Sequence, residues 1–274
     1  MHPLLVLFII HIANGNTVGK VSLKKYRVDE FKEDYPPIPE SPERSDSAAY
    51  QSRNGLLDPM YLWEDGRIPY VINGHFTQYE LQVIDLAMYL FNHFTCVQFV
   101  PRTYETFYVQ INNFVHGKCF SDVGKNLRAG INVINLGRGC FYGVGAVVHE
   151  LMHTVGFDHE QTRYDRDYYV TVNYHNLVPG TANNFRKIHG AMYNLPYDYD
   201  SVMHYAPYTF SVYQGGGPQY MSIVPKDMSK LHRLGQSHGF SKLDITKINI
   251  MYNCQQKTAQ MNLQDGIIYS IERE

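Results

Sequence analysis

The sequence predicts a protein of the α+β class, in which helices and short strands are mixed along the chain. Two segments carry apolar residues at helical spacing, one after Thr77 and one from Val144 to Val155. Short apolar or alternating segments bounded by Gly, Asn or Pro are typical of strands, and these span residues 97–100, 108–111 and 130–136. The chain has 274 residues, of which 44% are hydrophobic, so it is long enough to bury a core.

The first 15 residues have the pattern of a cleaved secretory signal peptide. Residues 3–10 form an unbroken apolar stretch, and the small residues Ala13 and Gly15 precede a possible cleavage position. A buried N-terminal strand is the alternative interpretation. No apolar run reaches the roughly 18 residues that a membrane helix needs. We therefore expect a secreted, extracellular protein without a membrane span.

Residues 16–53 cannot form a core of their own, because they are charged, punctuated by proline and poor in apolar residues. The apolar pattern becomes denser after Arg53, first in residues 61–63 and then in residues 68–72. The folded unit is therefore predicted to follow this boundary and to extend to Cys254. Residues 255–274 then form a C-terminal tail.

The helix after Thr77 begins with a capping box, since Glu80 follows at the position that pairs with the cap. The second helix is predicted to end at Gly156, where a left-handed C-cap is expected. A last helix precedes Cys254, and its apolar positions are Ile245, Ile248 and Ile250.

Composition narrows the possible partners and the cellular compartment. The formal net charge is -2, so the chain lacks the cationic character that nucleic-acid binding usually requires. The 4 cysteines match no CxxC zinc or redox spacing, and disulfides in an oxidising compartment are the better interpretation. Four cysteines allow three pairings, and their spacing does not choose among them. Buried free thiols are the alternative if the chain is not exported.

The second helix carries a candidate metal site. His149 and His153 are four residues apart, so both imidazoles leave the same helix face and can share one ion. Glu150 lies beside them, where a carboxylate can take a proton from a metal's water. After the turn at Gly156, His159 supplies a third nitrogen and leaves an open position for water.

Two other interpretations of these histidines are weaker. A helix with two solvent-facing histidines is common, but a third histidine and a glycine at fixed offsets are improbable by chance. Carbonic-anhydrase-like sites also use three histidines, but they lack a general base at the position of Glu150.

The residues around this site resemble the astacin family of zinc endopeptidases, which belongs to the metzincins. The segment HELMHTVGFDHEQTRYDRDYYV, residues 149–170, matches the signature HExxHxxGFxHExxRxDRDxYV at every defined position. Residues 201–205, Ser-Val-Met-His-Tyr, resemble the Met-turn of that family. Smaller matches lie around Trp63, Cys96 and Cys254, so the resemblance covers essentially the whole folded region.

The resemblance implies an N-terminal half with a twisted five-stranded sheet and two long helices, a more irregular C-terminal half, and one Zn²⁺ per subunit in the cleft between them. It implies the disulfides Cys96–Cys254 and Cys119–Cys140. It further implies that Tyr205 is a zinc ligand at rest and then stabilises the oxyanion, and that Met203 packs beneath the metal.

The resemblance also implies a zymogen whose propeptide is residues 16–53. Counted back from residues 61–63, the mature N-terminus is Asn54, which implies that a trypsin-like protease cleaves after Arg53 and that Glu160 receives the new N-terminus. Propeptides of the family inhibit through an aspartate in an FxGD pattern. Asp34 is the candidate latency residue here, although Glu33 replaces the glycine. A solvated charge run is the alternative.

The sequence therefore predicts a secreted, monomeric zinc endopeptidase that acts on polypeptides, with Glu150 as the catalytic base and Tyr205 as the oxyanion donor. A catalytically silent binding protein with the same fold is one alternative, and a zinc hydrolase of non-peptide esters is another. Lys226 and Arg233 are candidates for attracting an acidic substrate side chain, but solvated loop charges are the better explanation.

Overall fold

The computed structural model describes residues 23–27, 55, 58–188, 195–254 and 267–271. The predicted signal peptide, Asp34, Arg53 and Asn54 lie outside these residues. Within the predicted propeptide and tail, β1 (Leu23–Arg27) pairs antiparallel with β9 (Ile267–Ile271). Among the described residues, no helix combines the length and the apolar character needed to cross a bilayer.

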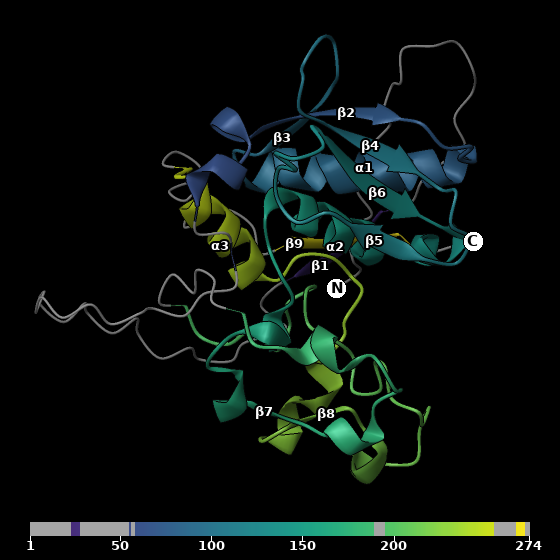
Figure 1. The fold of residues 1–274 in the computed structure, drawn as a ribbon, viewed down its shortest axis with the longest axis vertical. Helices are drawn as coiled ribbons and strands as arrows, with labels where there is room; N and C mark the ends of the chain where they lie inside the picture. Colours follow the sequence, from purple (N-terminus) through teal and green to yellow (C-terminus); the bar gives the residue numbers. More distant parts are fainter. Residues whose placement is uncertain (1–22, 28–54, 56–57, 189–194, 255–266, 272–274) are drawn as a thin grey trace, which may run out of the picture.

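A five-stranded mixed sheet forms the upper part of the molecule, as the resemblance implies (Figure 1). Its strand order is β3-β2-β4-β6-β5, and β5 alone runs antiparallel to its neighbour. This order leaves β5 at an edge. The strands are β2 (Arg67–Ile72), β3 (Gln98–Pro101), β4 (Tyr108–Asn112), β5 (Cys119–Ser121) and β6 (Ile131–Leu136).

Two helices share one apolar core with this sheet. Helix α1 (Gln78–Phe94) begins with the predicted capping box between Thr77 and Glu80. Helix α2 (Val144–Val155) has the predicted bounds, and Gly156 ends it with a φ of 123°, a backbone conformation that favours glycine. The fully buried side chains of this core include Val83, Ile84 and Phe91 from α1, Val147, Val148 and Leu151 from α2, and Ile68, Val109 and Ile134 from the sheet.

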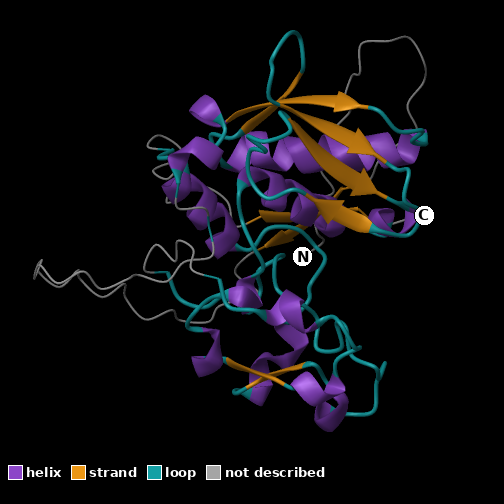
Figure 2. Cartoon of the chain, viewed as in Figure 1, coloured by secondary structure: helices purple, strands orange, loops and turns teal. Residues whose placement is uncertain are grey.

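The C-terminal half is irregular, as the resemblance implies. Its strands are β7 (Val170–Val172) and β8 (Ile223–Pro225), which pair antiparallel. Short 3-10 helices and loops make up most of the remainder (Figure 2). A small core of its own is built around Phe185 and Ile223, both fully buried.

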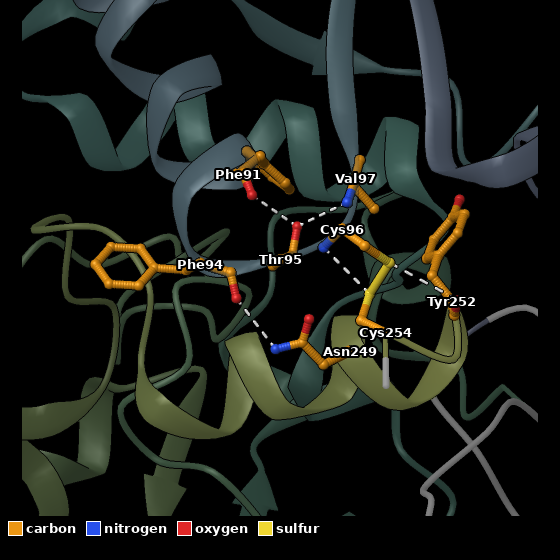
Figure 3. The surroundings of a disulfide bond; sticks show 8 residues. All are labelled: Phe91, Phe94, Thr95, Cys96, Val97, Asn249, Tyr252 and Cys254. Carbon is orange, nitrogen blue, oxygen red and sulfur yellow. Dashed lines mark hydrogen bonds between the residues drawn. A yellow bond between two sulfur atoms is a disulfide. The ribbon is translucent and has the colours of Figure 1, made fainter. Parts of the chain in front are cut away.

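Helix α3 (Lys242–Met251) returns the chain to the N-terminal half, where Ile248 joins the large core. Cys254 then forms a disulfide with Cys96, and the Cys96 N–H lies 3.2 Å from the Cys254 sulfur (Figure 3). Asn249 donates to the carbonyl of Phe94 at 3.1 Å. The second disulfide joins Cys119 to Cys140. Both pairs are those that the resemblance implies.

Buried ion pairs connect α3 to the segment after α2. Lys247 Nζ lies 2.7 Å from Glu160 Oε2, and the Arg163 guanidinium lies 3.0 Å from Glu160 Oε1. Burial alone would raise the pKa of Glu160, but Lys247 and Arg163 hold this pKa below its ordinary value. Because the folded-state pKa is lowered, the carboxylate stabilises the protein fully above about pH 4.3 and less as the pH falls below that.

We expect Lys247→Ala to destabilise the protein by about 3–5 kcal/mol, because it leaves the Glu160 carboxylate buried beside one cation fewer. Urea unfolding at pH 7 measures this loss. Lys242→Ala is the matched control, since Lys242 is exposed on the same helix and its removal should change the free energy of unfolding by less than about 0.5 kcal/mol. Equal effects of the two substitutions would contradict the assigned importance of the buried pair.

Candidate metal centre

Three imidazoles converge at the C-terminal end of α2. His149 and His153 lie one helical turn apart, with ring centroids 4.8 Å from each other. The turn at Gly156 brings His159 back, so that its ring centroid lies 5.1 Å from that of His149 and 4.7 Å from that of His153. The ligand atoms of all three residues lie within 4.8 Å of one another. The structure thus assembles the histidines that the sequence predicts.

The spacing of these nitrogens fits a tetrahedral zinc ion. Zn–N bonds of about 2.0–2.1 Å place two ligand nitrogens of a tetrahedron about 3.3–3.4 Å apart. The Nε2 atoms of His149 and His159 are 3.2 Å apart. Zinc would therefore be held by His149, His153 and His159, with one position left for water or substrate.

Two backbone carbonyls orient the ligands. The Val202 carbonyl lies 2.8 Å from His149 Nδ1, and the Phe157 carbonyl lies 2.7 Å from His153 Nδ1. Because a carbonyl only accepts, each Nδ1 carries the proton and each Nε2 keeps its lone pair for a metal. Burial lowers the pKa of all three imidazoles, that of His153 to about 3. The ligands are thus neutral at physiological pH, as metal binding requires.

Glu150 is a buried carboxylate beside these ligands. Its Oε2 atom has no hydrogen-bond partner among the described residues. Burial raises the pKa of Glu150 to about 8. A divalent cation held by the neighbouring imidazoles would stabilise the ionised form. The free oxygen is therefore available to accept a proton from a small molecule at the metal.

Tyr205 and Met203 come from the C-terminal half, as expected for a Met-turn. The ring centroid of Tyr205 lies 4.4 Å from that of His159, and Phe185 and Phe210 pack against the same tyrosine at 5.7 and 5.6 Å. Burial, and then the charge of Glu150, raise the pKa of Tyr205 to about 12. The phenol therefore keeps its proton at neutral pH and can donate a hydrogen bond. Met203 is buried, and its carbonyl accepts from the Glu160 N–H at 3.0 Å.

Three buried residues that the sequence interpretation missed fix the backbone of Tyr205. Gln161 Oε1 accepts the Tyr205 N–H at 3.1 Å, and His204 Nδ1 donates to the Tyr205 carbonyl at 2.8 Å. The Tyr197 hydroxyl donates to the other ring nitrogen of His204 at 2.8 Å, which sets the tautomer. The only sequence signal for these three residues was the position of His204 between Met203 and Tyr205, which pointed to His204 alone.

Asp244 of α3 supports the metal centre indirectly, through hydrogen bonds to the segment that contacts His149. Its carboxylate accepts the Val202 N–H at 2.9 Å and the Ser201 hydroxyl at 2.6 Å. The carbonyl of the same residue, Val202, orients His149, so Asp244 helps to fix the residue that positions one of the three imidazoles. The sequence contains a local signal for this residue, since Asp244 also completes a capping box with Ser241.

No described strand pairs with the outer edge of β5, and this edge of the sheet lies next to helix α2. Ser121 of β5 lies 2.9 Å from the hydroxyl of Thr154 on α2. Just beyond β5, the Gly124 N–H donates to the carbonyl of His153 at 2.9 Å. An extended polypeptide paired with β5 would therefore pass close to the imidazoles.

The other candidate residues lie elsewhere. Glu160 is fully buried between Lys247 and Arg163. Arg233 forms a two-pronged ion pair with Asp200, so its charge is already balanced. Lys226 is exposed. Asp34 and Asn54 are outside the described residues.

Comparison with known proteins gives one consistent family. The family model described as Astacin, a family of peptidases, matches residues 56–253. High choriolytic enzyme 2 of Oryzias latipes is 41% identical over 189 residues, which are 69% of this chain and 64% of that protein. Zinc metalloproteinase nas-7 of Caenorhabditis elegans is 38% identical over 206 residues, which are 74% of this chain and 51% of that protein.

A solved structure is also similar. High choriolytic enzyme 1, a hatching enzyme zinc-protease from the medaka fish Oryzias latipes, matches with a TM-score of 0.67 at 38% identity. The match covers 74% of this chain and 100% of that chain. The chain spans between about half and two thirds of the length of the relatives named above.

We expect His159→Ala to lower the affinity for zinc by more than about 100-fold, because even residues that only orient a ligand contribute about 10–100-fold. Zinc content after dialysis against a weak chelator measures the effect. The control is His175→Ala, which removes an exposed histidine and should leave one zinc per chain. Full zinc occupancy in the His159 variant would show that the three imidazoles are not the site.

Proposed function

The chain belongs to the astacin family of peptidases, and from this premise we propose that it is a zinc-dependent endopeptidase. The observation that carries the proposal is the convergence of three neutral imidazoles with a buried carboxylate that has an unpartnered oxygen. This arrangement holds a metal and a base side by side. Neither a binding protein nor a structural domain requires that combination.

Each polar group has a distinct task in peptide hydrolysis. Zinc, when bound, would polarise the scissile carbonyl and lower the pKa of the attacking water. Glu150 accepts the proton of that water through its free oxygen and passes it to the leaving amine. The neutral phenol of Tyr205 donates a hydrogen bond to the negative charge that develops on the carbonyl oxygen. The backbone contacts of Gln161 and His204 hold that phenol in reach.

The polypeptide substrate pairs with the outer edge of β5. No other strand in the described part of the chain pairs with this edge, and its contacts with α2 place it beside the three imidazoles. Main-chain hydrogen bonds of this kind depend little on the substrate's side chains. They also require an extended peptide, so unfolded or flexible segments are the preferred substrates.

The protein is made as a secreted zymogen, activated when a trypsin-like protease cleaves after Arg53. Gly55 forms a β-bridge with Phe157, which supports a position of the mature N-terminus near Glu160. The buried carboxylate of Glu160 is already paired with Lys247 and Arg163, so an N-terminal ammonium would be a further partner and not the first. Asp34 is the proposed latency residue, and the active form is a monomer.

We expect Glu150→Gln to lower kcat by about 10²–10⁴-fold, the range for loss of a general base, while one zinc per chain stays bound. Hydrolysis of a fluorogenic peptide and metal analysis of the same sample measure both properties. Glu64→Gln, which changes an exposed glutamate, is the control and should retain full activity. Substantial residual proteolysis by the Glu150 variant would overturn the assignment of the base.

The zymogen proposal predicts a defined product of limited proteolysis. Trypsin treatment of the full chain should yield a new N-terminus at Asn54, together with gelatin-cleaving activity that a zinc chelator abolishes. Correct processing without activity, in a protein that binds zinc, would favour the silent binding protein. Cleavage of esters but not of unfolded polypeptide would favour the ester hydrolase.

The Asp34→Ala zymogen should be active without processing, and if it stays inactive, Asp34 is not the latency residue.

A further inference from the structure

A hollow of about 430 Å³ lies beyond the C-terminal end of β5. The connection between β5 and β6 forms most of it, and Tyr61 lines it from outside that connection. The hollow contains neither metal ligands nor the proposed base. Its lining residues are Tyr61, Asp122, Val123, Lys125, Asn126, Leu127 and Arg128.

This hollow is close to the metal centre. Gly124, within the lining segment, donates its N–H to the carbonyl of the zinc ligand His153 at 2.9 Å. Asp122 directly follows Ser121, the last residue of β5. A peptide that pairs with β5 and continues past the end of the strand therefore reaches the hollow within a few residues.

The available charge in the hollow is positive. Neither Lys125 nor Arg128 forms an ion pair with any described carboxylate, and the Lys125 ammonium lies 5.2 Å from the ring centroid of Phe107. Asp122 is the one acidic residue of the lining, so two cations face one carboxylate. Its Oδ2 is turned toward the loop, where it accepts the Val133 N–H at 3.0 Å and an Asn126 N–H at 3.4 Å. Arg163 and Arg233, by contrast, are balanced by carboxylates.

Hydrogen bonds hold part of the loop that lines the hollow in one conformation. Asn132 is buried and clamps the loop, since its Nδ2 donates to the Gly124 carbonyl at 2.5 Å and its Oδ1 accepts the Asn126 N–H at 2.9 Å. The Lys125 N–H donates to the Tyr61 carbonyl at 2.7 Å. These bonds fix the backbone of residues 124–126, which carries Lys125, so a ligand does not have to order this part of the loop.

We propose that this hollow is a substrate subsite that takes an acidic side chain, with Lys125 and Arg128 as the residues that determine this specificity. The inference rests on the proposed peptidase function. Antiparallel pairs are slightly more stable than parallel ones, so the substrate runs antiparallel to β5. Its amino-terminal part then lies beside the C-terminal end of β5. The preferred acidic residue therefore lies two to four positions before the scissile bond.

The test compares two peptides that differ only at those positions, one carrying Ala and one carrying Glu. Binding is measured by fluorescence anisotropy with the trypsin-processed, zinc-loaded Glu150→Gln chain, which leaves the peptides uncut. We expect the Glu peptide to bind about three- to fivefold more tightly at low salt, the size of one or two partly exposed ion pairs, and this preference to shrink as salt screens the charges.

The double variant Lys125→Glu and Arg128→Glu, in the same inactive background, should reverse the preference and leave affinity for the Ala peptide within about twofold. Lys226→Glu is the control, because it reverses an exposed charge outside the hollow. An unchanged preference in the double variant, or a loss of preference in the control instead, overturns the subsite. A third peptide, with Glu only after the scissile bond, should bind no more tightly than the Ala peptide. Tighter binding of this third peptide alone overturns the subsite too, since the substrate direction would be wrong.

The proposed function is judged separately in the same set of experiments. If the processed wild-type chain binds but does not cut the Ala peptide, the peptidase proposal fails. The binding preference and its reversal still decide whether Lys125 and Arg128 select acidic residues. If the chain cuts both peptides equally and the double variant binds both equally, the peptidase stands and the subsite is wrong.

Discussion

The arrangement of the metal centre depends on one fully buried carboxylate, Glu160. Its neighbour His159 is one of the three imidazoles placed to bind zinc, its backbone N–H donates to the Met203 carbonyl, and its side chain is neutralised by Arg163 and by Lys247 of α3. A buried charge is tolerated only where such partners surround it. The need to pair Glu160 therefore fixes the relative positions of the loop that carries His159, the turn at Met203 and the last helix.

The local features of this site were predictable from the sequence, and its long-range supports were not. His149, His153 and Gly156 follow from helical geometry, which operates over a few residues. Lys247 meets Glu160 across 87 residues, and Asp244 meets Val202 across 42. The spacing of apolar residues along the sequence carries no information about such distant contacts. Strand β5 was missed because three residues are too few for an alternating pattern.

Within the C-terminal half, the resemblance predicted Tyr205 and Met203, but not the residues that hold them. Gln161, Tyr197 and His204 are buried polar side chains. Tyr197, His204 and Tyr205 lie close together in the sequence, whereas Gln161 reaches the Tyr205 N–H across 44 residues, a contact that only the folded chain makes. The backbone of Tyr205 is fixed at both its N–H and its carbonyl. Movement of the phenol is thereby confined to its side-chain torsions against Phe185 and Phe210.

Helix α3 comes from the C-terminal end of the folded unit, so it is among the last parts of this unit to be synthesised. A ribosome delivers His149, Glu150 and His159 long before it delivers Asp244, Lys247 and Cys254. The disulfide from Cys254 to Cys96 spans 158 residues, so it too must wait for the end of the domain. The metal centre is therefore incomplete on a nascent chain. Its assembly coincides with completion of the domain, and a polypeptide truncated before α3 carries the motif without the geometry.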